Sequence, residues 1–427
     1  MKWNGMGRGA KALAVSLALI LGVTACSRDY TVAYLYVTAA TKTTTGLIDG
    51  YEIDYQTGAL SPLADSPIPS GGRNPVAIVA MPDGSGLFVL NHDDSTVVAF
   101  NVGTDGKIYQ QAVYNTTGTF PTSAAVDSQG KFLYVTYTYQ SGFTTASPGA
   151  GGLTVFPITE ATNPNVVTLG TGVNYNLGTK PVGITVGNSI CRADQSGATY
   201  TTSSCTVSGS GAAGHKTIPY VFAVDQEISA ASVPIGVIRV FQQNQTTGAL
   251  TAIAGNLLGG FAAGTLPGAI AVDPQEQFVY VTDQSTNQVY GNTIVAGGGL
   301  SPMNSSPFAT GQLPMGLTID PRGSFLYVAN YNSNTISTYA IDAALGALTS
   351  AGTTSVATGP TCVTVEPALG IYLYSSNYID NSVSGEQLNP HTGALTGIQG
   401  TQFSASALPT CTTAIANGQH ATQVVTQ

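Results

Sequence analysis

A proline followed by a short apolar segment recurs seven times along this 427-residue chain. Successive prolines are 46, 60, 86, 47, 46 and 49 residues apart, so four of the six intervals share one period and two contain insertions. A fixed period of this length is the signature of a repeat architecture, in which each unit buries its apolar face against its neighbours. The seven segments are PVAIVA from Pro75, PTSAAV from Pro121, PVGITV from Pro181, PGAIAV from Pro267, PMGLTI from Pro314, PTCVTV from Pro360 and PTCTTAI from Pro409.

Each unit contains three further strand patterns. The second strand is rich in aromatic and β-branched residues, which favour half-buried pleated surfaces, and it reads YLYVT, LFVLN, FLYVT, YVFAVD, FVYVT, FLYVAN and YLYSSN. A third strand follows, and a fourth opens with a turn such as Thr57-Gly58-Ala59-Leu60. The 51 glycines and 22 prolines suit short strands joined by tight turns. We therefore predict an all-β fold, a seven-bladed β-propeller with four antiparallel strands per blade.

The two ends of the repeat region predict how the ring closes. The first unit begins at its second strand, at Tyr34, whereas the last proline-led strand, from Pro409, has no complete set of partners. Pairing the C-terminal strand with the three N-terminal ones would leave no long exposed edge. We expect the propeller to span residues 34–416 and to be followed by a tail at 417–427.

The consensus of these units, a proline-led strand, an Asp-Pro-x-Gly turn and a Tyr-Val-Thr-Asn-like strand, resembles the YVTN-type repeat of the lactonase-like seven-bladed propellers. That family includes a bacterial 6-phosphogluconolactonase and the fungal carboxymuconate cyclase. The resemblance covers about residues 30–416 and implies the propeller fold. It also implies lactone hydrolysis, although no catalytic set of His, Arg and Glu carries over residue by residue, so the catalytic residues stay unassigned.

The N-terminus has the pattern of a secretory signal peptide over residues 1–25, with a basic segment followed by an apolar one. It ends in Val23-Thr24-Ala25-Cys26, which resembles a bacterial lipobox; the alternative is an ordinary signal with a chance cysteine. Acylation of Cys26, for example with palmitate, would anchor the chain to the membrane through a short linker over 26–33. Ser27 in place of Asp resembles outer-membrane sorting, if the source is Gram-negative. We expect an exported lipoprotein of the cell envelope.

The net charge of the chain limits the classes of partner that we expect. The formal net charge is -9 and no cluster of Lys or Arg occurs, which argues against nucleic-acid binding. No phosphate loop, nucleophile elbow or zinc-ligand spacing is present in the sequence. We expect a monomer with no cofactor and no metal.

Two basic residues flank the proline-led strands at the expected channel mouth, Arg73 and Lys180. They could form a two-point clamp for a carboxylate or phosphate, or simply be solvated charges. The recurring acid in the Asp-Pro turns could act in catalysis, but tight turns also favour Asp before Pro and Gly. Asn91-His92-Asp93-Asp94 contains metal-binding residue types, yet it occupies the position of a hairpin turn. For both motifs we favour the turn interpretation.

The remaining four cysteines allow two disulfides in an oxidising compartment. Cys191 and Cys205 lie in one insertion and predict a local bridge. Cys362 and Cys411 occupy the same Pro-Thr-Cys position in two units, so a bridge between neighbouring blades is the alternative to two buried thiols.

Insertions at 140–152 and 187–219 are rich in Gly, Ser and Thr, and are either plain surface loops or, if they share one face, an asymmetric binding rim. We expect an envelope binding or scaffold protein whose ligand is a protein, glycan or small molecule at a propeller face. The competing hypothesis is a lactone hydrolase that acts at the channel mouth.

Overall fold

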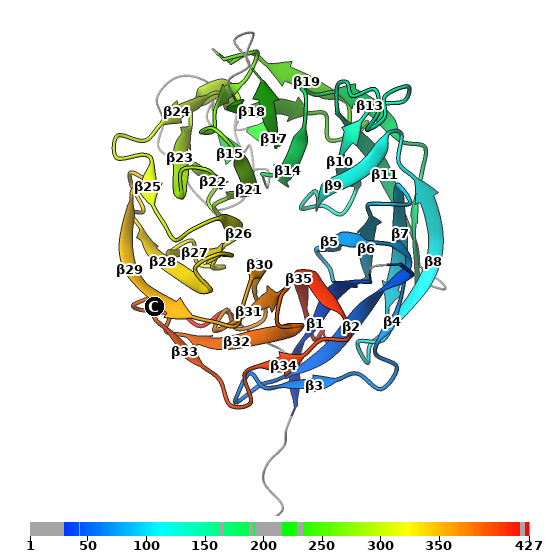
Figure 1. Cartoon of the computed structure of the whole chain (residues 1–427), viewed down its shortest axis with the longest axis vertical. Coiled ribbons are helices and arrows are strands. Elements are labelled where there is room, and N and C mark those ends of the chain that lie inside the picture. Colours follow the sequence, from blue (N-terminus) through cyan, green and yellow to red (C-terminus); the bar gives the residue numbers. More distant parts are fainter. Residues whose placement is uncertain are drawn as a thin grey trace, which may run out of the picture.

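The computed structural model describes residues 30–41, 43–162, 165–187, 191–192, 216–217, 219–228, 234–255, 257–418 and 423–426. These residues form seven antiparallel blades in a ring around a central channel (Figure 1). The predicted seven-bladed propeller is confirmed. Among the described residues, the 3₁₀ turn η1 (Ala296–Gly298) is the only helical element, and no helix there has the length and hydropathy needed to cross a bilayer.

Each blade consists of four consecutive strands, and in several blades a short extra strand pairs with the third one. Blade 1 contains β35 (Leu408–Ala416), β1 (Thr31–Ala40), β2 (Thr45–Asp54) and β3 (Leu60–Pro62), with β4 (Ile68–Arg73) beside β2. Blade 2 contains β5 (Pro75–Ala80), β6 (Gly86–Asn91), β7 (Thr96–Val102) and β8 (Ile108–Asn115). Blade 3 contains β9 (Thr119–Val126), β10 (Phe132–Tyr139), β11 (Gly152–Thr162), β12 (Asn165–Leu169) and β13 (Val173–Asn176).

The remaining four blades follow the same order from the channel outward. Blade 4 contains β14 (Pro181–Val186), β17 (Tyr220–Ile228), β18 (Pro234–Gln243), β19 (Leu250–Ile253) and β20 (Phe261–Ala262). Blade 5 contains β21 (Pro267–Val272), β22 (Phe278–Asp283), β23 (Gln288–Ile294), β24 (Leu300–Pro302) and β25 (Phe308–Ala309). Blade 6 contains β26 (Pro314–Ile319), β27 (Phe325–Asn330), β28 (Thr335–Ile341) and β29 (Leu348–Ser355). Blade 7 contains β30 (Pro360–Val365), β31 (Tyr372–Asn377), β32 (Ser382–Leu388), β33 (Leu395–Gly397) and β34 (Phe403–Ser404).

Blade 1 joins the two ends of the chain. β35 is its innermost strand and pairs antiparallel with β1, with Tyr36 opposite Thr413 and Thr38 opposite Cys411. This pairing gives β1 a partner on both sides, because β2 follows on the other side. The predicted closure of the ring by the N- and C-terminal strands is therefore confirmed.

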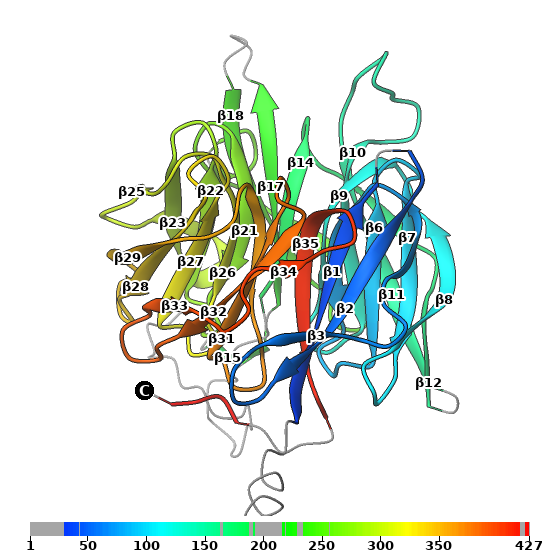
Figure 2. The ribbon, with the colours of Figure 1, turned by 60° about the horizontal axis from the view of Figure 1, so that its bottom comes forward.

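The two flat ends of the propeller carry different connections (Figure 2). On the base face, β1 begins, first strands connect to second strands, and third strands connect to fourth strands. On the opposite mouth face, the chain enters each innermost strand, and second strands connect to third strands. The fold therefore assigns each loop to one of the two faces by its position between strands.

The two insertions leave the propeller from opposite faces, so the condition for an asymmetric rim, a shared face, is not met where they join the blades. Residues 140–151 connect the second and third strands of blade 3 and project from the mouth face (Figure 2). The 187–219 insertion connects β14 to β17, so it begins and ends on the base face; within it the structure describes the short strands β15 (Cys191–Arg192) and β16 (Lys216–Thr217). Because antiparallel strands reverse direction at every turn, loops one connection apart in a blade open on opposite faces.

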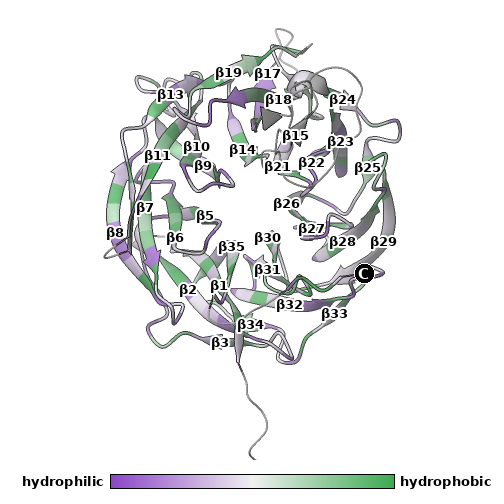
Figure 3. Cartoon of the chain, turned by 180° about the vertical axis from the view of Figure 1, so that it is seen from behind, coloured by the Kyte–Doolittle hydropathy of each residue, from purple (hydrophilic) through white to green (hydrophobic). Residues whose placement is uncertain are grey.

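The buried apolar side chains form seven separate clusters among the described residues, one at each interface between neighbouring blades. Figure 3 shows apolar stretches along β6, β7 and β11. The cluster between blades 7 and 1 joins Leu35 and Ile53 to Tyr374 and Val383. Each blade consequently depends on both neighbours to remove its apolar faces from water.

A tyrosine hydroxyl links one blade to the next at four of these interfaces. Tyr36, Tyr280, Tyr327 and Tyr374 donate to the carbonyl oxygens of Gly106, Gly346, Gly393 and Gly58, at distances of 2.6, 2.7, 3.1 and 2.6 Å. Each glycine has φ between 68° and 75°, a region that L side chains rarely adopt. A Cβ there would also overlap the aromatic ring two residues before the tyrosine. At these four interfaces the aromatic strand and the glycine of the turn therefore recur together, because each fits the other in the adjacent blade.

The acids of the turns between first and second strands are turn formers. Asp273 is buried, and its Oδ1 accepts hydrogen bonds from the backbone N–H groups of Gln277 and Phe278, at 2.7 and 2.6 Å. Asp127, Asp320 and Glu366 bind backbone N–H groups of their own turns in the same way. Because these carboxylates are used within the turns, the turn interpretation is confirmed.

We expect Tyr374→Phe to lower the free energy of unfolding by about 1–2 kcal/mol, because it leaves the Gly58 carbonyl without its hydrogen-bond donor across the blade 7–blade 1 interface. Urea denaturation monitored by circular dichroism measures the change. Tyr109→Phe, at a side chain that is 52% exposed, is the control and should leave stability unchanged. Equal stability of the two variants would show that the hydroxyl does not couple the blades.

Candidate functional site

A cavity of about 640 Å³ occupies the channel and is lined by the innermost strands of all seven blades. Four polar side chains, Lys180, Gln226, Gln284 and Tyr378, lie toward the mouth face. The innermost strands contribute Val76, Thr122, Ser123, Ala124, Val182, Gly183, Ile184, Gly268, Ala269, Ile270, Met315, Gly316, Leu317, Thr361, Cys362, Val363, Thr410 and Cys411. None of these described lining residues is an acid or a histidine. The cavity therefore offers hydrogen-bonding groups and one ammonium group.

Hydrogen bonds between blades position the polar residues around the mouth. Thr410 Oγ1 donates to the Pro75 carbonyl oxygen at 2.7 Å, and Thr122 Oγ1 donates to that of Pro181 at 2.9 Å. Gln226 Nε2 donates to the carbonyl oxygen of Pro267 at 2.7 Å. These prolines start innermost strands, and a register shift immediately follows each of them. The mouth is therefore a fixed polar ring rather than a set of independent side chains.

Of the two basic residues predicted at the channel mouth, Lys180 lines the cavity. It is exposed and immediately precedes Pro181, the first residue of β14. Its backbone is fixed at both ends: the N–H donates to Asp225 Oδ1 at 2.8 Å, and the carbonyl oxygen accepts from the Gln226 N–H at 2.9 Å. These two hydrogen bonds fix the main chain of Lys180 at the cavity, while its side chain is exposed to solvent.

Arg73 does not join Lys180 at the cavity. Its guanidinium lies on Asp94 of the β6–β7 turn, with Nε and Nη2 at 2.7 and 2.6 Å from Oδ1, and its N–H donates to Oδ2 of the same carboxylate at 2.7 Å. This pair holds the pKa of Asp94 below its usual range. Arg73 is therefore paired with Asp94 on the mouth face and does not line the cavity, so the clamp alternative that the sequence left open is not formed in this structure.

A buried ionic cluster supports the loop that carries Lys180. Arg239 on β18 contacts two acids of β17: Nε lies 3.1 Å from Asp225 Oδ2, and Nη2 lies 2.5 Å from Glu227 Oε1. Glu227 Oε2 in turn accepts a hydrogen bond from Thr179 Oγ1, the residue before Lys180. The Asp225 side chain is inaccessible and that of Arg239 is only 17% exposed. Glu227 and Asp225 thus bind Thr179 and Lys180, and Arg239 holds both carboxylates in place.

Asp225 occupies a position that is Asn or Asp in several blades, but its charged neighbours Glu227 and Arg239 are particular to blade 4. In five blades the residue opposite the first proline is Asn or Asp, namely Asn91, Asp225, Asp283, Asn330 and Asn377. Asp283, for example, accepts hydrogen bonds from the N–H groups of Thr265 and Leu266. Burial first, and the adjacent Glu227 second, raise the pKa of Asp225 to about 6. Burial alone would raise the pKa of Glu227 too, but hydrogen bonds from Thr179 and Arg239 hold it below its usual value.

This cluster was missed at the sequence level, although a signal was present. The strand VIRVFQQ places Arg239 inside an otherwise apolar segment, and an arginine there requires buried anionic partners. Two acids at alternate positions of the preceding strand, in YVFAVDQEI, face the same side of the sheet and supply those partners.

The four histidines and the remaining predicted site residues lie apart from the cavity or outside the described residues. His92 stacks on Phe120 with ring centroids 4.9 Å apart, and its Nδ1 lies 2.7 Å from Asp93 Oδ1. His391 occupies the β32–β33 turn. His215, His420, Cys26 and Cys205 are outside the described residues, as are the side chain of Cys191 and the predicted bridge between Cys191 and Cys205. Where the structure is described, no three His, Cys, Asp or Glu side chains are arranged to hold a metal.

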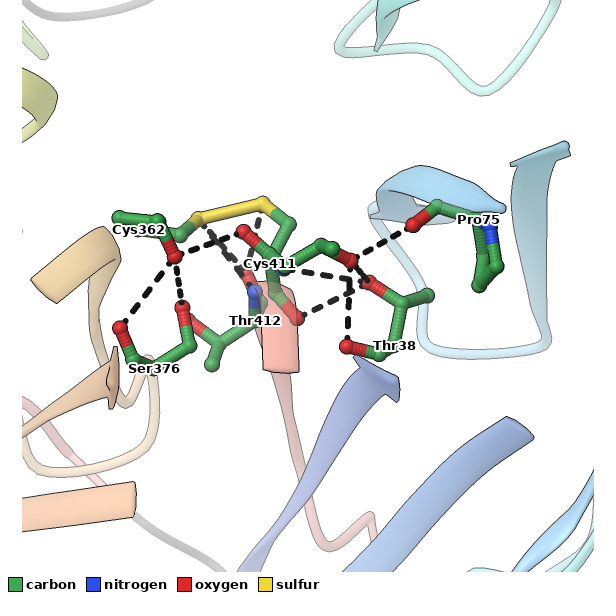
Figure 4. The surroundings of a disulfide bond; sticks show 8 residues. Thr38, Pro75, Cys362, Ser376, Cys411 and Thr412 are labelled. Atoms are coloured by element: carbon green, nitrogen blue, oxygen red, sulfur yellow. Dashed lines mark hydrogen bonds between the residues drawn. A yellow bond between two sulfur atoms is a disulfide. The ribbon is translucent and has the colours of Figure 1, made fainter. Parts of the chain in front are cut away.

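Cys362 and Cys411 form a disulfide in the wall of the cavity (Figure 4). It joins β30 of blade 7 to β35 of blade 1, with the Cα atoms 4.9 Å apart. Thr361 Oγ1 adds a hydrogen bond to the Thr410 carbonyl oxygen at 3.0 Å beside it. The bridge therefore links neighbouring blades where the chain ends meet.

Comparison with known proteins agrees with this architecture. The family model described as a lactonase, seven-bladed β-propeller, matches residues 34–172 and 235–365. The chain belongs to the lactonase family of seven-bladed β-propellers. No curated protein matches the sequence.

Solved structures of lactonase-like propellers superpose over most of the chain. The periplasmic gluconolactonase of Pseudomonas aeruginosa has 18% sequence identity and a TM-score of 0.66, covering 90% of this chain and 99% of its own. Candidate 6-phosphogluconolactonases from Bacteroides uniformis and Bacteroides fragilis have 16% and 17% identity, with TM-scores of 0.63 and 0.62. The first covers 90% of this chain and 100% of its own, and the second 91% and 99%. At this level of identity the likeness establishes the fold.

We expect Arg239→Met to lower the free energy of unfolding by about 3–5 kcal/mol, because it leaves two buried carboxylates without their cation. Chemical denaturation measures the change. Arg73→Met, which removes an exposed ion pair, is the matched control and should change stability little. A comparable loss in both variants would indicate that the buried cluster has no special role.

The raised pKa of Asp225 gives stability a pH dependence of predictable sign. The folded protein holds a proton at Asp225 more tightly than the unfolded chain does, so this contribution is complete below about pH 4 and is lost as the pH rises through about 6. Relative to Asp225→Asn, the wild-type free energy of unfolding should fall by roughly 1–3 kcal/mol between about pH 4 and pH 7. Unfolding titrations at several pH values provide the measurement.

Asp94→Asn is the control with the opposite sign. Because Arg73 lowers the pKa of Asp94, the stabilising contribution of that carboxylate is present above its ordinary pKa and is lost as the pH falls. An Asp225→Asn profile that parallels the wild type would contradict the raised pKa.

Proposed function

We propose that this lactonase-family propeller is a binding protein of the cell envelope, exported and lipid-anchored through Cys26, which takes a small polar anion into the mouth of its channel. The observation that carries the binding site is the cavity itself. It combines the ammonium group of Lys180 with the amides of Gln226 and Gln284 and the phenol of Tyr378. A pocket with few convergent polar groups on a rigid scaffold is the usual form of a small-molecule site.

The charge distribution around the mouth supports an anionic ligand. Lys180 has no ion-pair partner among the described residues, and its backbone is fixed by Asp225 and Gln226. The acids nearest to it are already engaged: Asp225 and Glu227 pair with Arg239. A ligand carboxylate or phosphate would therefore meet an ammonium group that no acid in the described part of the chain pairs with.

Lactone hydrolysis is the second candidate, and the family membership favours it. Hydrolysis requires a general base within reach of the attacking water. The described cavity lining supplies no such base. Asp225 has a raised pKa, but its carboxylate accepts a hydrogen bond from the Lys180 main chain. We therefore place binding before hydrolysis.

Binding is tested with gluconate and glucose, two ligands of similar size that differ in charge, by titration calorimetry on residues 27–427. Gluconate should bind more tightly than glucose. Lys180→Met should weaken gluconate binding by about tenfold, equivalent to about 1.4 kcal/mol, and leave glucose unaffected. Lys131→Met, on the base face, is the matched control. Equal gluconate affinity in wild type and Lys180→Met would refute the anion site.

Hydrolysis is tested on the same preparations with a panel of lactones that includes gluconolactone and 6-phosphogluconolactone. We expect no turnover above background. Turnover that disappears in Lys180→Met and persists in Lys131→Met would instead make the channel mouth the active site of a lactone hydrolase.

A further inference from the structure

The start of β1 lies on the opposite face from the candidate binding site. Thr31 begins β1 on the base face, whereas Lys180 precedes β14 on the mouth face. Tyr30 is fixed there by its neighbour Tyr55 in the turn after β2: the ring centroids are 4.3 Å apart, and the Tyr55 N–H donates to the Tyr30 carbonyl oxygen at 3.0 Å. The first residue that the structure describes, Tyr30, is thus part of the base face.

The proposed lipid attachment site is only four residues before this fixed point. Consecutive Cα atoms are 3.8 Å apart, so the Cα atom of Cys26 lies within about 15 Å of that of Tyr30, whatever the conformation between them. Acyl chains on Cys26 would enter the bilayer directly at that residue. So short a tether holds the base face close to the lipid surface.

A second feature of the base face suits a lipid surface. Turns between third and fourth strands place a threonine before the glycine at Thr57, Thr247 and Thr392, and each threonine hydroxyl accepts a hydrogen bond from the backbone N–H two residues on, at 3.3 Å. In the Asp342–Gly346 turn of blade 6 this residue is Leu345. Its side chain is 66% exposed, the highest value among the large apolar side chains described. The preceding Ala343 and Ala344 are exposed as well.

An exposed Ala-Ala-Leu turn leaves apolar surface in water where blades 1, 4 and 7 have a turn with a hydrogen-bonded threonine. Leucine gains free energy by leaving water for the boundary between lipid headgroups and acyl chains. Leu345 lies in blade 6 and Tyr30 beside blade 1, so they are two separate points on one face. Contact at both would fix the orientation of the propeller.

We propose that the base face lies against the lipid bilayer, with Leu345 at the boundary of the acyl chains, and that the Lys180 mouth faces away from the membrane. This inference rests on the proposed lipid anchor at Cys26. It places the cavity and the 140–151 loop toward the aqueous compartment, where a soluble ligand reaches them without passing between protein and lipid.

The sequence permits a direct test by tryptophan fluorescence. Trp3 is the only tryptophan, and it lies within the proposed signal peptide, so the mature lipoprotein contains none. Leu345→Trp introduces a probe on the base face. Ile379→Trp introduces the matched probe on the mouth face, at a side chain that is 52% exposed in the β31–β32 turn. Each lipidated variant is reconstituted into phosphatidylcholine vesicles with and without brominated acyl chains, which quench tryptophan on contact.

Brominated lipid should reduce the emission of Leu345→Trp by at least about twofold and leave that of Ile379→Trp unchanged. Quenching of Ile379→Trp alone, equal quenching of both, or quenching of neither would overturn the proposed orientation. Co-sedimentation with vesicles is measured first, with Cys26→Ser as the unlipidated control. A Cys26 protein that stays in the aqueous fraction would refute the anchor itself, and this result is distinguishable from an anchored protein in the wrong orientation.

Discussion

The packing of one blade against the next is the interaction on which the rest of this structure depends. The apolar clusters lie between blades, and several include residues from strands far apart in sequence. A blade with a missing neighbour would expose a whole apolar face. The pairing of β35 with β1, the Tyr374 to Gly58 hydrogen bond and the Cys362–Cys411 bridge all act at blade 1 and its junction with blade 7. Much of the covalent and hydrogen-bonding support for the ring is thus concentrated where the chain ends meet.

The repeat made the fold predictable because its period reports packing directly. Every blade contains a proline-led strand and an aromatic strand, and four of the seven contain a Gly-Ala-Leu turn, so the blade order can be read from the repeat. The same logic predicted the closure at blade 1 and the turn role of Asp273 and its counterparts. The bridge between Cys362 and Cys411 was foreseeable as well, because equivalent positions on neighbouring innermost strands lie side by side.

The candidate site was less predictable because it depends on what differs between repeats. Position in the repeat correctly indicated that Lys180 lies at the mouth, but it indicated the same for Arg73, whose guanidinium is held by Asp94 of another turn. Ion pairing decides which of the two basic side chains can bind a ligand, and the repeat pattern does not show which residues pair. The faces of the two insertions could have been assigned, since one follows a first strand and the other a second strand. Arg239 and its acids were visible only as an exception to the apolar pattern of β18.

The closure at blade 1 also sets the order of events during biosynthesis. Among the strands of the propeller, β1 is synthesised first and β35 last. Until residues 408–416 have left the ribosome, β1 has an unpaired edge and blades 1 and 7 lack their shared support. The ring therefore cannot close before residues 408–416 have been synthesised. For the export proposed above, this delay would be useful, because a chain that crosses a secretion channel unfolded must not complete its fold before it has crossed.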